Sequence, residues 1–231
     1  MSPQREIAIS QVPSVLIFDV NETLLDLAEL DPLLIEIFGA PSPRGEWFAR
    51  LLHGSVVANY TGSYRPFGAI GVEALLNLAK RRGVDLAEED ARGVVGTMLS
   101  APPHADVAPA LQLLAEAGLR MVTLTNSSSE AVAAQMENAG LNDYFETMIS
   151  VEGVRLFKPA PEVYRRAAEQ LGVEIDQGLL IASHDWDVLG ARVTGMPGAF
   201  LARPGAVWGL PDPQPDLVAP DLSALANRLI G

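Results

Sequence analysis

The fold is decided by residues 15–26, which read VLIFDVNETLLD. Four apolar residues in a row are typical of a strand that is buried on both faces of a parallel sheet. Asp19 follows this run directly, so its carboxylate is expected at the carboxyl end of the strand, where open α/β sheets bind their ligands. A desolvated and oriented carboxylate there is competent as a nucleophile, and a turn or cap aspartate is the alternative. The stretch therefore predicts a parallel α/β sheet with Asp19 in its crevice.

The composition limits the class of protein. Of 231 residues, 48% are hydrophobic and 19% are charged, which is typical of a globular chain with a core and an inserted subdomain. No apolar run approaches the roughly 18 residues of a membrane span, and the N-terminus has no signal-peptide core, so we expect a cytoplasmic protein outside the membrane. The absence of cysteine excludes disulfides, thiolate ligands and cysteine nucleophiles. A net charge of -13 argues against a nucleic-acid partner, and any anion site must be built locally.

Apolar runs and helical patterns alternate through the later part of the chain. The runs predict five buried strands, at Val12–Val20, Leu119–Asn126, Thr147–Val151, Gly178–Ser183 and Gly198–Ala202. Helices are predicted at Ser127–Ala139, Pro161–Leu171 and Asp187–Thr194, the first beginning with a capping box of Ser127 and Glu130. The proline-rich residues 211–220 are expected to form a surface excursion before a last helix at Leu222–Leu229. The alternation indicates a parallel sheet with helices on both faces.

Residues 30–101 show a different pattern. They contain no clear strand, and they fall into helix-like pieces separated by turn signals at residues 39–44, 61–64 and 83. A stretch of about 70 residues is too long for a simple loop. We therefore expect a helical cap at 30–101, inserted after the first strand into a core formed by 1–29 and 102–231.

Four short polar segments are expected at the carboxyl ends of strands. They are Asp19, Thr125-Asn126, Lys158 and the stretch Ser183–Asp187. The last three are about 30 residues apart, close to the length of one β-α repeat, so the segments can converge on one crevice. This order of motifs resembles the haloacid dehalogenase superfamily. The resemblance implies a Rossmann-like core with a helical cap, and an active site between the two.

Two positions resemble the (S)-2-haloacid dehalogenase branch of that superfamily. The phosphatases of the superfamily carry acids at the positions of Asn21 and Ser183, and both acids are missing here. Trp186 and Asp187 match the dehalogenase pattern. Asp185 could still ligate a metal, but the loss of two acids predicts an enzyme with no metal and no other cofactor.

The resemblance also implies roles around the nucleophile. Lys158 would hold Asp19 ionised and oriented, although a lysine alone before a turn is more often solvated. Asp187 would then position Lys158. Tyr164 follows Lys158 at the spacing of a family tyrosine near the active site, and a place in the core is an equal alternative.

His184 and Glu22 depart from the family pattern, which has asparagine and glycine at these two positions. Hydrolysis of an ester on Asp19 needs a general base, and histidine is suitable because its unperturbed pKa lies near neutrality. A carboxylate on the other ring nitrogen improves such a base. We therefore predict a dyad of His184 and Glu22 that activates the hydrolytic water. The alternative is a polar core histidine and a solvated glutamate.

The halide site is a further departure. The family uses a cap arginine next to a tryptophan, and aligning Trp47 with that tryptophan puts Phe48 at the arginine position. We expect Arg50 to substitute, with Arg44 as a weaker candidate and an apolar pocket including Phe48 and Trp186 as the alternative. The candidate substrate-binding residues are Asn21, Phe48, Arg50, Thr125, Asn126, Tyr164 and Trp186, of which Thr125 and Asn126 would cradle the substrate carboxylate.

The sequence thus predicts hydrolytic dehalogenation of short (S)-2-haloalkanoic acids to 2-hydroxy acids through an ester on Asp19, without metal. The resemblance implies a homodimer. Two other readings remain, a magnesium-dependent phosphatase and a catalytically weak binding scaffold. The missing acid at position 21 opposes the first, and the retained Asp19, Lys158 and Asp187 oppose the second.

Overall fold

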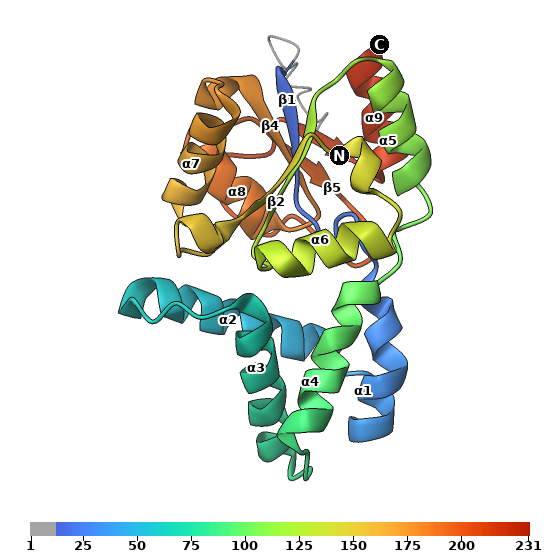
Figure 1. The fold of residues 1–231 in the computed structure, drawn as a ribbon, viewed down its shortest axis with the longest axis vertical. Helices are drawn as coiled ribbons and strands as arrows, with labels where there is room; N and C mark the ends of the chain where they lie inside the picture. The colour runs from blue at the N-terminus through green and yellow to red at the C-terminus, as the bar shows by residue number, and fades with distance from the viewer. Residues whose placement is uncertain (1–12) are drawn as a thin grey trace.

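The computed structural model describes residues 13–231, which form a parallel sheet flanked by helices and a separate lobe of helices (Figure 1). The sheet has six strands in the order β3-β2-β1-β4-β5-β6, and every neighbouring pair is parallel. The strands are β1 (Val15–Phe18), β2 (Met121–Thr125), β3 (Thr147–Ser150), β4 (Gly178–Ala182), β5 (Gly198–Leu201) and β6 (Leu217–Ala219). Strand order reverses beside β1, so the crevice of the sheet opens at the carboxyl end of that strand.

Helices cover both faces of the sheet. They are α5 (Val107–Glu116), α6 (Ser129–Asn138), α7 (Pro161–Leu171), α8 (Asp185–Val193) and α9 (Leu222–Ile230). In Figure 1, α7 and α8 lie on one side of the sheet and α5 and α9 on the other. This is the α/β architecture that the alternating pattern predicted.

The five predicted strands are confirmed, each within a few residues of the expected ends, although Val12 lies outside the described residues. Three details were wrong. Strand β6 lies inside the stretch expected to be a proline-rich excursion. Helix α8 begins at Asp185, two residues before the expected start. The cap of α6 is Ser128, whose hydroxyl accepts from the Ala131 N–H, because Ser127 is drawn away to accept a hydrogen bond from Asn21.

The lobe is built from α1 (Asp31–Phe38), α2 (Arg44–Thr61), α3 (Phe67–Arg82) and α4 (Glu88–Gly96). Gly62 and Gly83 end α2 and α3 in the left-handed conformation that favours glycine. Trp47 fixes α2 against α3, because its ring is fully buried and its Nε1 donates to the Gly71 carbonyl at 2.9 Å. These helices fall within residues 30–101, and the division of the chain into two units stays a prediction.

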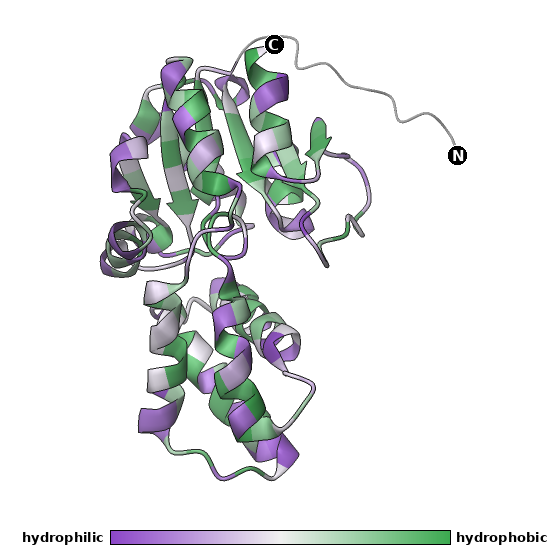
Figure 2. Cartoon of the chain, turned by 90° about the vertical axis from the view of Figure 1, so that its right-hand side faces the viewer, coloured by the Kyte–Doolittle hydropathy of each residue, from purple (hydrophilic) through white to green (hydrophobic). Residues whose placement is uncertain are grey.

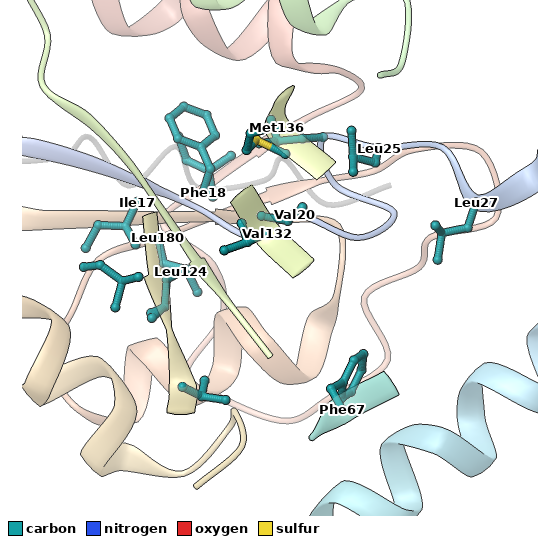
Figure 3. Close-up of a cluster of buried hydrophobic side chains, with 14 of the residues drawn as sticks. Ile17, Phe18, Val20, Leu25, Leu27, Phe67, Leu124, Val132, Met136 and Leu180 are labelled. Carbon is teal, nitrogen blue, oxygen red and sulfur yellow. The ribbon is translucent and has the colours of Figure 1, made fainter. Parts of the chain in front are cut away.

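Apolar residues concentrate on the strands of the sheet (Figure 2). The cluster in Figure 3 runs from Ile17 and Phe18 of β1 to Leu124 of β2 and Leu180 of β4. It continues beyond β1 through buried side chains of the loop that follows Asp19, among them Val20, Leu24 and Leu25. The loop that carries the polar site is therefore anchored by its own apolar residues. No helix in residues 13–231 combines the length and the apolarity that a membrane crossing requires.

A substitution at Gly190 tests how closely α8 packs against the rest of the core. A Cβ atom added there would lie 2.5 Å from Tyr164 Oη and 2.6 Å from Pro159 Cβ. Gly190→Ala should therefore lower the free energy of unfolding by about 1–3 kcal/mol, measured by urea denaturation. Gly93→Ala on α4 is the matched control, because nothing lies within 4 Å of the new methyl group. The control should be stabilised by up to about 1 kcal/mol, and equal effects in both variants would contradict the packing argument.

Candidate active site

Asp19 lies just beyond β1 and is held through both oxygens. Its Oδ1 accepts from Lys158 Nζ at 2.8 Å, and its Oδ2 accepts from Thr23 Oγ1 at 2.7 Å. His184 Nδ1 lies 3.1 Å from the same Oδ2. Burial alone would raise the pKa of Asp19, but the charge of Lys158 and the contact with His184 outweigh it and hold the pKa well below its usual range. The carboxylate is therefore ionised and fixed in orientation.

Lys158 is completely buried, so the alternative of a solvated lysine is wrong. Its ammonium group donates to Asp19, to Asp187 Oδ2 at 2.6 Å and to the Leu124 carbonyl at 2.8 Å. Three acceptors use all three N–H donors of the group. Burial would lower the pKa of Lys158, but the charges of Asp187 and Asp19 outweigh it and raise the pKa. The lysine therefore stays charged between the two carboxylates.

Tyr164 contacts this cluster through Asp187. Its hydroxyl donates to Asp187 Oδ1 at 2.6 Å, and its side chain is completely buried. The predicted contact of Tyr164 with substrate is therefore not supported by this geometry, because its one polar atom points at Asp187 and away from solvent. Tyr164 and Lys158 between them occupy both oxygens of Asp187, which supports the predicted positioning role of that residue.

His184 joins Asp19 to Glu22. Its Nε2 lies 3.2 Å from Glu22 Oε2, so the predicted contact between the two residues is present. Burial would lower the pKa of His184, but hydrogen bonds to Asp19 and Glu22 and the charges of both carboxylates raise it to about 9. The rings of Phe48 and Trp186 stack on the imidazole, with centroids 5.6 Å and 5.0 Å away. The resting histidine is therefore an imidazolium between two carboxylates and two aromatic rings.

Glu22 has a backbone φ of 60°, in the left-handed region that favours glycine. Its carbonyl lies 3.2 Å from His104 Nε2, and its carboxylate accepts from Arg44 Nη1 at 2.6 Å. Sequence reasoning missed Thr23, which donates to Asp19 and accepts from the Ser183 N–H at 2.9 Å. A hydroxyl four residues after Asp19, on the same loop, was the available signal.

The expected anion cradle lies after β2. Thr125 Oγ1 accepts from the Ser127 N–H at 3.1 Å, and Asn126 Oδ1 accepts from the Lys158 N–H at 2.9 Å. The amide nitrogen of Asn126 has no protein partner among residues 13–231 and is free to donate. The Asn21 side chain is instead hydrogen-bonded within the protein, donating to Ser127 Oγ and accepting from Gln135 Nε2. Asn21 therefore braces the cradle, and its predicted contact with substrate is not supported by this geometry.

Arg50 is not brought to the site. It donates to Glu46 at 2.8 Å and lines a different cavity with His53 and Arg65. Phe48 faces His184, and a residue two positions further along α2 is turned away by about 200°. The expectation that Arg50 receives the halide is therefore wrong in position. Arg44, the weaker candidate, lies beside Glu22.

An open cavity of about 630 Å³ gives solvent access to the His184–Glu22 pair. Its wall includes Glu22, Arg44, His104, Ser183, His184 and Arg203. Within residues 13–231 there is no group of three or more His, Cys, Asp or Glu side chains placed to hold a metal ion.

Comparison with known proteins gives a consistent result. The sequence profile of the haloacid dehalogenase-like hydrolases matches residues 13–195. The (S)-2-haloacid dehalogenase H-109 of Pseudomonas putida is 28% identical, over 93% of this chain and 97% of its own. The (S)-2-haloacid dehalogenase of Xanthobacter autotrophicus is 30% identical, over 81% of this chain and 74% of its own. The structure of an L-2-haloacid dehalogenase from X. autotrophicus with chloropropionic acid covalently bound has a TM-score of 0.86 at 26% identity, covering 95% of this chain and 99% of that one.

The raised pKa of His184 predicts how stability depends on pH. The folded value is about 9, and the unfolded value is about 6.5. Protonation of His184 therefore stabilises the fold fully below about pH 6.5, and this contribution is lost as the pH rises through about 9. Urea titrations across this range should show a fall in the free energy of unfolding of up to about 1.4 kcal/mol per pH unit, and His184→Asn should flatten it. An identical pH dependence in the two proteins would contradict the assigned protonation state.

Proposed function

This chain belongs to the haloacid dehalogenase-like hydrolase family, and we propose that it hydrolyses the carbon–halide bond of short (S)-2-haloalkanoic acids to give 2-hydroxy acids. The observation that carries the proposal is the ionised Asp19, fixed by Lys158 and next to the His184–Glu22 pair. A carboxylate nucleophile with an adjacent base suits a reaction that first forms an ester and then hydrolyses it. The relative with chloropropionic acid covalently bound supports such an intermediate.

The first half of the reaction is alkylation. A carboxylate oxygen of Asp19 attacks C2 of the substrate, and the halide leaves with the bonding electrons as the new C–O bond forms. Attack from the side opposite the halide inverts the configuration at C2. Lys158 keeps the nucleophile ionised, and the burial of Asp19 increases its reactivity by limiting its hydration.

The substrate carboxylate has to be bound locally, because the protein carries a net charge of -13. We assign this role to the free amide nitrogen of Asn126, directly after β2, because the N–H groups of Ser129 and Ala131 at the start of α6 already donate to Glu152 and to Ser128. With Arg50 turned away, we assign halide departure to the aromatic side of the site, next to Phe48 and Trp186. The imidazolium of His184 lies between these rings and supplies positive charge there.

The second half is hydrolysis of the ester. Alkylation removes the charge of Asp19, one of the two carboxylates that hold the proton on His184, so His184 releases that proton to solvent through the adjoining cavity. Neutral His184 then takes a proton from water, and the hydroxide attacks Cγ of Asp19. Collapse breaks the bond between Cγ and the alkoxide oxygen, and the alkoxide takes the proton of the new carboxyl group. This restores the Asp19 carboxylate and the imidazolium, with one proton released per turnover.

Two further expectations stay predictions. The homodimer and the cytoplasmic location rest on the resemblance and on composition. The phosphatase reading has no observation in its favour, because Asn21 at the position of the required acid is hydrogen-bonded within the protein.

The proposed activity is tested by halide release from (S)-2-chloropropionate and chloroacetate in the presence of EDTA. The native protein should release chloride and form the 2-hydroxy acid, and Asp19→Asn should release none above the blank, because it lacks the nucleophile. Release of phosphate from a generic phosphate ester on addition of magnesium, with no chloride from either haloacid, would favour a phosphatase instead.

The proposed base is tested by trapping the intermediate. His184→Asn removes the base and keeps the nucleophile, so the ester should accumulate as a substrate-sized mass increment on Asp19. Its hydrolysis should slow by about 10²-fold or more. Rapid turnover in this variant with no adduct would refute the role of His184.

A further inference from the structure

Helix α2 lies across the carboxyl edge of the sheet and contacts the core near both of its ends (Figure 1). Near the C-terminal end, the Asn59 side chain donates to the Phe157 carbonyl and accepts from the Phe157 N–H, both at 2.8 Å. At the N-terminal end, Arg44 donates to Glu22 at 2.6 Å. These two positions are about 22 Å apart along the helix, and Phe48 lies between them on His184. The helix therefore bridges the site and is tied on either side of it.

The guanidinium of Arg44 is itself fixed. Its Nε donates to Asp31 Oδ1 at 3.0 Å, and the same oxygen accepts from Ser42 Oγ at 2.6 Å. Asp31 and Ser42 belong to the helical lobe, whereas Glu22 belongs to the nucleophile loop of the core. Arg44 is thus held by the lobe on one side and reaches into the core on the other. An arginine is suited to this because its planar group presents donors in fixed directions.

We propose that Arg44 is a positioning residue that holds Glu22 against His184, so that docking of the helical lobe assembles the base for ester hydrolysis. This inference rests on the proposed function, since it gives Arg44 a role in the second half of that reaction. It assigns Arg44 no contact with substrate.

The need for such a residue follows from the state of Glu22. The side chain of Glu22 is 28% exposed, and its backbone has the left-handed φ of 60°. A partly exposed carboxylate at the edge of a 630 Å³ cavity has other rotamers available in solvent. Arg44 donates to Oε1 of Glu22, and Oε2 faces His184. The hydrogen bond to Arg44 therefore fixes the orientation in which the carboxylate meets His184. Without Arg44, solvent competes for both oxygens.

The direction of the pKa change separates positioning from simple charge screening. If Arg44 only screened Glu22, its removal would strengthen the pull of Glu22 on the His184 proton and raise the pKa of His184. If Arg44 holds Glu22 in place, its removal lets Glu22 turn away, and the pKa of His184 falls from about 9 towards its ordinary value. The other charged or titratable groups around His184 are Asp19 and, through Asp19, Lys158, together with the cavity residues Asp26, His104, Asp185 and Arg203. None of these is changed in the variants below.

The experiment measures the pKa of His184 by NMR titration of the free protein. Arg44→Met keeps the aliphatic stem and removes the donor, and it should lower the pKa of His184. Arg44→Lys keeps a charge and one donor at a time, and it should give an intermediate value. Asn59→Ala is the matched control, because it removes the other tie between α2 and the core and leaves Glu22 untouched. It should leave the pKa of His184 at about 9.

The kinetic arm uses (S)-2-chloropropionate in a single turnover of Arg44→Met. At about pH 6, where His184 keeps its proton in both proteins, formation of the ester on Asp19 should keep its native rate. Hydrolysis of the ester should slow by about tenfold, a part of the contribution of a general base. An unchanged or raised pKa in Arg44→Met would overturn the proposal, as would an equal fall in Asn59→Ala. If the pKa falls as expected while no protein forms an ester, the positioning of Glu22 stands and the dehalogenase function fails.

Discussion

The site depends on the burial of one ammonium group between two carboxylates. Lys158 comes from the loop after β3, and its partners come from three other strand ends: Asp19 follows β1, Leu124 lies in β2, and Asp187 follows β4. An unpaired charge at this depth would be very costly, so the cluster forms only when all four segments are in register. Burial outweighs the charge of Lys158 and raises the pKa of Asp187, so this carboxylate depends on its hydrogen bonds from Lys158 and Tyr164. The parallel sheet, with β1 and β4 side by side, is what makes this convergence possible.

Charges alternate outward from this cluster to the helical lobe. The order is Asp187, Lys158, Asp19, His184, Glu22 and Arg44, with each neighbouring pair in hydrogen-bond contact. Neutralising one carboxylate lowers the pKa of the cations next to it, because each cation keeps its proton through the carboxylates on either side. In the proposed reaction, alkylation of Asp19 is such a change, and it would convert His184 from a cation that orients Asp19 into a base. One histidine would therefore serve both halves of the proposed reaction.

The parts of the fold that follow local rules could be predicted from the sequence. Buried parallel strands are continuous apolar runs, and Gly62 and Gly83 mark where α2 and α3 end, so these elements were recognised. Strand β6 was missed because its three residues lie among prolines and pair only at the sheet edge. The prediction that Ser127 caps α6 was wrong because its hydroxyl accepts a hydrogen bond from Asn21, a residue distant in sequence. The prediction that Arg50 lies in the site was wrong for a different reason. Arg50 is close to Phe48 in sequence, but two residues so close along a helix do not lie on the same face.

The three departures from the family pattern are best understood as one set. The resemblance puts arginine, asparagine and glycine where this chain has Phe48, His184 and Glu22. Phe48 stacks on His184, so an arginine at position 48 would bring a second cation to the side of the imidazolium, which is costly in a site of low dielectric constant. A phenylalanine there stabilises the same charge through its ring face. The imidazolium in turn needs the carboxylate of Glu22, and a carboxylate at a left-handed position needs Arg44 to direct it. Phe48, His184 and Glu22 therefore depend on one another. We do not expect any one of them to give an active site when it alone replaces the family residue at its position.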